Sequence, residues 1–223
     1  MRTGLGFGGA ALGLPLLLLL GGTPIYWLPI IGIHLLFFTS LSLKKSLKQV
    51  DWHYLKNALL WILPPTIIGV FGLINLPDRS IIIFIYSITL FYAITWVFNQ
   101  TIHSNKAWVD KLLLVLGGYI AGTSLTGAPL IVAVFMRHIN KEKLRNTLFV
   151  LWFILVGIKM TTFVILQVNI DWLFSLSLIP IATIGHIIGL KLHNKIIKND
   201  MLFKKWVGGV LSVISILGLI KII

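Results

Sequence analysis

The sequence contains no cysteine and little charge, since charged residues make up 11% of its 223 positions. The missing cysteines exclude disulfides, thiolate chemistry and cysteine-ligated metal. Acidic residues are the scarcer charged group, with six against 19 lysines and arginines. A chain so poor in charge cannot cover a water-soluble surface with polar groups. Soluble enzymes and small disulfide-rich domains are therefore excluded.

The sequence instead contains long apolar runs. Hydrophobic residues make up 57% of the chain, and the mean hydropathy is +0.97. A helix of about 20 apolar residues crosses a hydrocarbon core of roughly 30 Å. The runs predicted as spans are 23–41, 58–75, 81–98, 148–166, 172–190 and 207–222. The runs 4–21 and 112–136 are interrupted by glycine and proline. The chain is thus predicted to be an all-α multi-pass protein of the cell membrane.

The net charge of +13 could indicate a nucleic-acid partner, but the basic residues fall in short loops between the apolar runs. This placement follows the rule that cytoplasmic loops retain lysine and arginine. The basic loops contain Lys44, Lys45, Lys48 and Lys56; Lys106 and Lys111; Arg137, Lys141, Lys143 and Arg145; and Lys191, Lys195, Lys198, Lys204 and Lys205. We therefore expect the lipid bilayer, and no nucleic acid, around this chain.

The run 112–136 decides whether these loops share one side of the membrane. If it crossed once, two strongly basic loops would lie on opposite sides, against the charge rule. If it enters and returns as two half-helices, all the basic loops are cytoplasmic. Irregular backbone is tolerated at that depth where it is buried in protein or lines a cavity. A re-entrant pair is the favoured prediction, and a single kinked span is the alternative.

The two halves of the chain resemble each other. LGLP at 12–15 parallels TGAP at 126–129, and VDW at 50–52 parallels IDW at 170–172. The loop before the first DW pair is basic, whereas the loop before the second carries no charge, so the equivalent loops are expected on opposite sides. That reversal is typical of the inverted repeats of secondary transporters. We predict repeats at 1–111 and 112–223, each a broken segment followed by three transmembrane helices.

Three stretches carry a resemblance to a known family: GLGFGGAALGLPLLLLL, then FFTSLSLKKSLKQVDWHYLKNALLWILPPTIIGVFG, then GGYIAGTSLTGAPLIVAVFM. In this order they resemble the sulfite exporter TauE/SafE family of membrane permeases, over nearly the whole chain. The resemblance implies export of sulfite or a small organosulfonate from the cytoplasm. The family's glycine run is present at residues 6–9 and reduced at 125–129, which leaves open a relative that carries a different anion.

The glycine-rich segments are the first candidate for a substrate site. Glycine permits close backbone approach, and helix N-termini favour anions through free N–H groups and the helix dipole. The alternative is that these glycines only allow helices to pack closely. The candidate residues are Gly8, Gly9 and Gly13 in the first segment and Gly122, Thr123, Ser124 and Gly127 in the second. The hydroxyls of Thr123, Ser124 and Thr126 are expected to act as donors there.

The ionisable residues predict an anionic substrate. All six acids fall in loops or at helix ends on this segmentation, so no carboxylate serves a cation site inside the membrane. Lys159 is the basic residue placed in mid-span, where an ammonium is costly unless it meets a partner, a cavity or an anion. We predict that it balances the substrate charge. Its alternatives are snorkelling to the interface or a structural role.

Other polar residues are weaker candidates. His34 and His186 could exchange protons near neutral pH, and each could equally be a hydrogen-bonded bundle residue. Thr39 and Ser40 could contact the substrate or bond the carbonyls of the preceding turn. Asp51 and Asp171 are predicted to cap helices next to interfacial tryptophans.

Three classes of function are compatible with a membrane chain. The prediction is a secondary transporter of a small anion that works by alternating access. An intramembrane enzyme would need a nucleophile with a base or a metal constellation, and no such arrangement is present in the sequence. A structural or assembly subunit would use the same glycines for packing. No cofactor or metal is expected, and the sequence does not set the oligomeric state.

Overall fold

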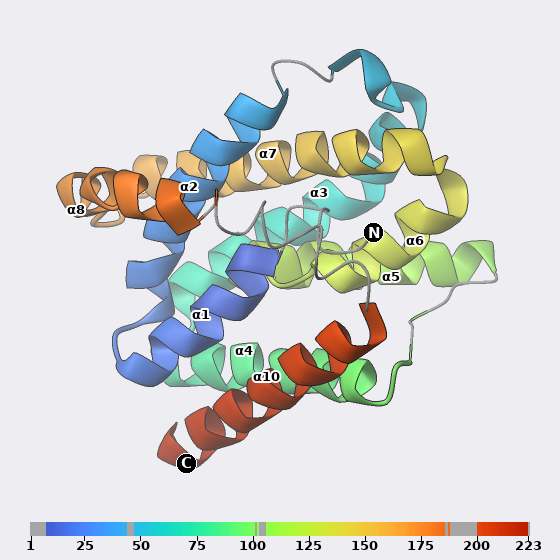
Figure 1. Cartoon of the computed structure of the whole chain (residues 1–223). Coiled ribbons are helices and arrows are strands. Elements are labelled where there is room, and N and C mark those ends of the chain that lie inside the picture. The colour runs from blue at the N-terminus through green and yellow to red at the C-terminus, as the bar shows by residue number, and fades with distance from the viewer. Residues whose placement is uncertain are drawn as a thin grey trace.

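The computed structural model describes residues 8–43, 47–100, 102, 106–185, 187 and 200–222, and every regular element among them is helical (Figure 1). Apolar segments in lipid must satisfy their backbone groups internally, which a helix does. The elements are α1 (Gly8–Leu20), α2 (Pro24–Leu43), η1 (Leu47–Gln49), α3 (Trp52–Asn75), α4 (Asp78–Val97), α5 (Ala107–Ser124), α6 (Ala128–His138), α7 (Lys141–Ile165), α8 (Trp172–Ser177) and α10 (Asp200–Ile222).

Five of the described helices are long and apolar enough to cross a membrane: Pro24–Leu43, Trp52–Asn75, Asp78–Val97, Lys141–Ile165 and Lys205–Ile222. They confirm the predicted spans 23–41, 58–75, 81–98, 148–166 and 207–222. α3 and α7 begin earlier than predicted, because their polar first turns continue the same helix beyond the apolar run. The protein is a multi-pass membrane protein.

Two predicted segments differ from the structure. The span 172–190 is not continuous, because α8 ends at Ser177, Leu178 forms a turn, and the helix resumes over 179–185. Pro180 follows this turn, and proline removes a helix N–H and clashes with the preceding turn. Its last residues, 188–190, lie outside the described part.

The break predicted within 4–21 is wrong over residues 8–20, where α1 is one helix with Pro15 inside it. Residues 4–7 lie outside the described part. Neighbouring helices can support the backbone around a membrane proline, and the Tyr86 hydroxyl donates to the Pro15 carbonyl at 3.2 Å. The described part of α1 has 13 residues.

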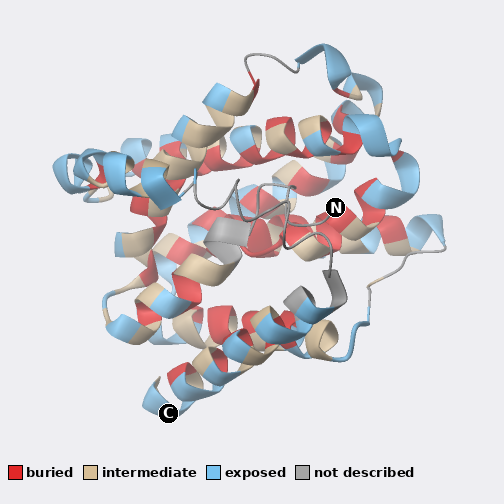
Figure 2. Ribbon diagram, in the orientation of Figure 1, coloured by how far each residue is buried: buried red, intermediate tan, exposed pale blue. Residues whose placement is uncertain are grey.

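The helices pack in pairs around a shared interior. α3 lies against α5, α4 against α10, and α2 against α7. The α3–α5 pair is especially close, because a methyl group at Gly69 would strike the Tyr119 carbonyl oxygen. Buried residues gather along α5, α6 and α7, whereas exposed residues predominate on α8 (Figure 2). The α5–α6–α7 region is therefore the interior of the molecule.

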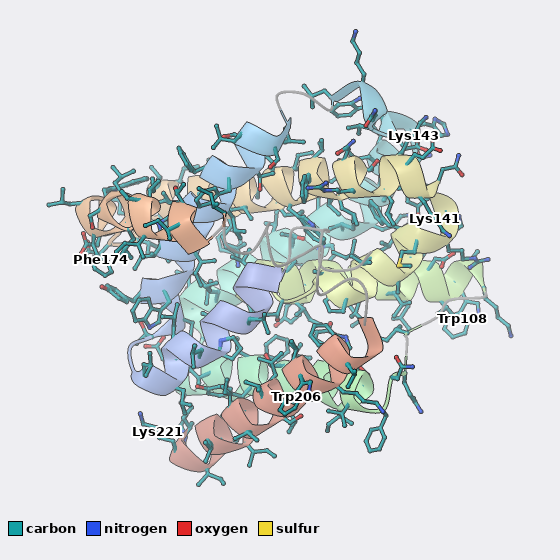
Figure 3. All side chains as sticks on the ribbon, viewed as in Figure 1. Trp108, Lys141, Lys143, Phe174, Trp206 and Lys221 are labelled. Carbon is teal, nitrogen blue, oxygen red and sulfur yellow. The ribbon has the colours of Figure 1, made fainter. Side chains whose placement is uncertain are left out.

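The ends of the helices divide the molecule into two sides. Trp108 at the start of α5 and Lys141 and Lys143 at the start of α7 lie at one end, and Phe174 and Lys221 lie at the other (Figure 3). Two basic loops of the sequence, around Lys106 and around Lys141, thus share an end. This arrangement agrees with the prediction that 112–136 returns to the side from which it starts.

Candidate functional site

The α5–α6 hairpin is the central feature of the interior. α5 ends at Ser124, Leu125 adopts the left-handed conformation with φ 60°, and α6 begins at Ala128. α6 then runs back along α5, so that a methyl group at Gly127 would strike the Gly117 carbonyl oxygen. The predicted pair of half-helices within 112–136 is therefore present, and the single kinked span is wrong.

The base of the hairpin is closed by ionic contacts. Asp110 in the first turn of α5 is buried, and its Oδ2 accepts a hydrogen bond of 2.8 Å from Arg137 Nη1 at the end of α6. The same oxygen lies 2.8 Å from His138 Nε2, which donates because a carboxylate can only accept. The Tyr54 ring of α3 stacks on the His138 imidazole at 5.2 Å. These contacts hold both ends of the hairpin together and tie them to α3.

The tip of the hairpin contains hydroxyl groups whose hydrogens are already used. Thr123 donates to the Tyr119 carbonyl at 2.8 Å, and Ser124 donates to the Ile120 carbonyl at 3.0 Å. The Ser124 and Thr126 hydroxyl oxygens lie 2.6 Å apart, so Thr126 donates to Ser124. In this structure the three hydroxyls therefore donate within the chain, because a hydroxyl on a helix bonds most readily to the carbonyl one turn back.

The remaining donors at the tip belong to the backbone. α6 has no side-chain cap, and Pro129 in its first turn has no N–H. The N–H groups of Ala128 and Leu130 belong to the first turn, whose N–H groups have no partner inside the helix. The positive end of the helix dipole adds to their potential for an anion. The whole turn from Thr123 to Ala128 is buried.

The candidate glycines have different surroundings. A methyl group at Gly122 would strike the Thr66 carbonyl oxygen of α3, so Gly122 is required for close packing. Gly13 of α1 is half-buried, and a methyl group there would meet no described atom within 4 Å. Gly8 and Gly9 lie in the first turn of α1, but their surroundings fall outside the described part. Packing thus accounts for Gly122 and Gly127, and Gly13 faces open space.

Lys159 lies in the buried stripe of α7. Its side chain is 1% exposed, and its ammonium nitrogen has no hydrogen-bond partner within the described residues. Leu155, Val156, Met160 and Phe163 on the same face of α7 are all buried. The snorkelling alternative is therefore wrong. Helix periodicity places residue 159 on the same face as 155 and 163, so the ammonium points inward with the core residues.

The hairpin tip and this part of α7 share one apolar cluster. Leu125 packs in the cluster that contains Val156, Met160 and Phe163 of α7 and Leu14 of α1. The same cluster includes Tyr86 of α4. Three parts of the chain that the sequence predicted separately, namely α1, the hairpin tip and mid-α7, therefore contribute to one apolar cluster.

The weaker candidates have structural partners where they are described. His34 Nε2 lies 2.9 Å from the Ser175 carbonyl oxygen of α8 and must donate to it. Ser40 donates to the Phe37 carbonyl at 2.8 Å, which agrees with the alternative that its hydroxyl bonds the preceding turn. Thr39 is half-buried on α2. The side chain of His186 lies outside the described part.

The predicted aspartate caps are confirmed. Asp51 accepts from the Tyr54 N–H at 3.0 Å at the start of α3, and Asp171 accepts from the Phe174 N–H at 2.9 Å at the start of α8. Each is followed by an exposed tryptophan, as interfacial anchors are.

The ionic closure of the hairpin and one buried phenol could not be predicted from the sequence. An acid 27 residues before Arg137 gives no local signal, and only the hairpin brings them together. Tyr92 of α4 is 5% exposed, and its hydroxyl has no partner in the described chain. Aromatic residues in apolar runs are ordinary, so no pattern in the sequence distinguishes Tyr92 from the other aromatic residues. Within the described residues, no group of three or more possible metal ligands is present.

The chain matches the family model described as Sulfite exporter TauE/SafE over residues 1–217. The protein belongs to the TauE/SafE family. It is therefore a membrane transporter and not an enzyme. No curated protein and no solved structure matches the chain. For this TauE/SafE protein, family membership suggests export of an anion of the sulfite or sulfonate class, and the site residues must be argued from its own geometry.

Proposed function

We propose that this protein exports sulfite or a small organosulfonate by alternating access, and that the anion binds at the tip of the α5–α6 hairpin. The observation that carries the proposal is the buried, uncapped N-terminus of α6 in a core that also contains the unpartnered ammonium of Lys159. Both features attract negative charge, and family membership supplies the class of anion.

The chemistry of the tip favours a small oxyanion. Sulfite and sulfonates present several acceptor oxygens and no donor once ionised. The hydroxyl hydrogens at Thr123, Ser124 and Thr126 are used internally, so the N–H groups of Ala128 and Leu130 are the donors that remain. Oriented backbone N–H groups bind anions without a change in protonation.

Lys159 would supply the balancing charge. A buried ammonium without a partner is costly, and an anion in the same core would reduce that cost. Among the described acids, none is bonded to it, and the buried Asp110 is engaged at the base of the hairpin. Gly13 of α1 leaves open space and would form the facing wall of the site.

The two halves are proposed to be inverted repeats that exchange access between the two sides. Asp51 and Asp171 cap α3 and α8 with the same backbone geometry, φ −85°, ψ 81° and φ −76°, ψ 82°. α2 packs against α7 and α8, and α7 packs against α2 and α3. Exchanging α2 with α7 and α3 with α8 leaves this pattern unchanged, which supports a two-fold relation. Rocking of related halves about a central site is the usual form of alternating access.

The test is uptake of radiolabelled sulfite into proteoliposomes, with sulfate, thiosulfate and sulfoacetate as competitors. The unaltered chain is compared with Lys159→Met and with Lys143→Met, which removes one exposed charge from the same helix. We expect saturable flux that Lys159→Met lowers at least tenfold and Lys143→Met leaves unchanged.

The melting temperature (Tm) separates function from folding. Replacing a buried, unpartnered charge by an apolar side chain of similar length is often neutral or stabilising. We therefore expect Lys159→Met to melt at or above the Tm of the unaltered chain. Flux retained in Lys159→Met would remove the lysine from the proposal, and absence of flux from folded protein would favour the structural-subunit alternative.

A further inference from the structure

Tyr92 is a buried polar residue that packing alone does not explain. Its side chain is 5% exposed, and its hydroxyl is shielded from solvent without a hydrogen-bond partner among the described residues. Buried tyrosine hydroxyls usually find a partner, because an unmade hydrogen bond inside a protein is unfavourable. Phenylalanine would fill the same space without this cost.

A second tyrosine of α4 provides the contrast. Tyr86 is 1% exposed, and its hydroxyl donates to the Pro15 carbonyl at 3.2 Å. Its ring occupies the space next to Gly218 of α10, where a methyl group would strike it. The hydroxyl of Tyr86 thus has a structural use, whereas that of Tyr92 has none among the described residues.

The surroundings of Tyr92 connect it with both helices of the hairpin. Tyr92 belongs to an apolar cluster with Ile120 of α5 and Leu130 of α6. The Ile120 carbonyl accepts the Ser124 hydroxyl, and Leu130 lies in the first turn of α6, where its N–H is one of the groups proposed to bind the anion. The cluster of Tyr92 therefore includes one residue from each half-helix.

The hairpin shares one apolar cluster with each of two donors that have no partner among the described residues. Leu125 belongs to the cluster of the α7 segment that carries Lys159, and Leu130 belongs to the cluster of Tyr92. An ammonium and a neutral phenol both donate hydrogen bonds and neither is matched by an acceptor in the described chain. An anion of the sulfite or sulfonate class is an acceptor that both donors could share.

We propose that the Tyr92 hydroxyl is a substrate-binding donor that contacts an oxygen of the anion from the α4 side of the hairpin. The inference rests on the proposed function and adds a residue and a helix to its site. A hydrogen bond from a neutral donor to an anion is stronger than one between neutral groups, so its loss weakens binding about tenfold.

The test measures KM for sulfite uptake in proteoliposomes and Tm in detergent for Tyr92→Phe, Tyr86→Phe and Ser215→Ala. Ser215 is a matched control, because its hydroxyl is also buried without a described partner but lies on α10, which packs on α4 and α1. Tyr92→Phe should raise KM about tenfold with Tm unchanged or higher. Tyr86→Phe should lower Tm. Ser215→Ala should leave KM unchanged and should not lower Tm.

The outcomes separate this inference from the proposed function. Sulfite flux with an unchanged KM in Tyr92→Phe would overturn the role of Tyr92 and leave the transport proposal intact. A lower Tm in Tyr92→Phe, whatever its KM, would also overturn it, because the hydroxyl would then have a structural partner. Absence of flux from the folded, unaltered chain would remove both proposals together.

Discussion

α1 and the α5–α6 hairpin contain similar short sequences, LGLP and TGAP, yet they are built differently. In α1 the proline lies inside a continuous helix, and Gly13 next to it faces open space. In the hairpin the proline lies in the first turn of α6, and Gly122 and Gly127 are pressed against backbone. A glycine and a proline therefore allow a helix to break but do not require it. In the hairpin, the break coincides with tight packing of Gly122 and Gly127 against neighbouring backbone.

The anchoring of the two segments also differs. α1 is tied by single bonds, from Tyr86 to the Pro15 carbonyl and from Lys221 to the Leu19 carbonyl at 3.2 Å. The hairpin is closed at its base by Asp110 and packed along its length against α3. Within the described residues, the hairpin is thus held by an ion pair and by packing along its length, whereas the side-chain hydrogen bonds to α1 come from Tyr86 and Lys221.

The largest expected effect comes from filling the close contact at Gly122. Gly122→Ala would drive a methyl group into the Thr66 carbonyl oxygen, and neither backbone can yield without separating α3 from α5. We expect a loss of at least about 3 kcal/mol, the upper end for overpacking. Size-exclusion chromatography in detergent should show little monodisperse protein.

Gly13→Ala is the matched change in α1. Alanine fits the open space and favours the helix over glycine by up to about 1 kcal/mol. The Tm should stay the same or rise, while sulfite uptake changes if Gly13 lines the site. Equal losses of folded protein in Gly122→Ala and Gly13→Ala would contradict the proposed difference in packing between the hairpin and α1.

Opening the base of the hairpin should have the next largest effect. Asp110→Asn removes the charge that Arg137 and His138 share, and the side chain of Arg137 is 36% exposed, so water compensates in part. We expect a loss of about 1–2 kcal/mol, less than for a fully buried pair. This corresponds to about 2–4 °C in Tm for each kcal/mol in a chain of this size.

Glu142→Gln serves as the control for charge removal, because Glu142 is exposed in the first turn of α7. Its Tm should remain close to that of the unaltered chain. If Asp110→Asn and Glu142→Gln have the same Tm, the ionic contacts of Asp110 do not stabilise the hairpin.

The helix caps test the relation between the halves. Asp51→Ala and Asp171→Ala each remove a carboxylate that accepts one N–H, at 3.0 and 2.9 Å. Each should cost about 1 kcal/mol, the usual value for such a cap. Thermal unfolding of the two single variants should give equal shifts, and a clear inequality would weaken the proposed two-fold relation.

The hydroxyls should have an effect no larger than that of the caps. Ser124→Ala removes a buried bond to the Ile120 carbonyl and the acceptor for Thr126, at a cost of about 1 kcal/mol. Ser40→Ala removes a bond within the turn of α2 at a half-buried position and should cost less. Neither should abolish sulfite uptake, because neither hydroxyl has a hydrogen free for the anion. Loss of flux in Ser40→Ala alone would return that residue to the site.

Five of the spans and the aspartate caps could be predicted because each depends on neighbours in sequence, whereas the paired half-helices were predicted from the charge of the loops on either side of 112–136. Twenty apolar residues in lipid must form a helix, and a carboxylate caps the N–H groups two or three residues ahead. The partners of the Thr123 and Ser124 hydroxyls could not be predicted in this way. These hydroxyls bond to carbonyls of their own helix, and residue type alone does not show whether a hydroxyl bonds to such a carbonyl or to a ligand.

The sequence by itself determined a multi-pass helical membrane protein, the position of the hairpin turn, and membership of the TauE/SafE family. Only the tertiary structure decided that Lys159 is enclosed, that Asp110 closes the hairpin, and that Tyr92 is buried without a partner among the described residues. The physical reason is the distance along the chain over which each interaction acts. Hydropathy and capping act within one helix, whereas burial and hydrogen-bond satisfaction in the interior depend on which distant helices pack together.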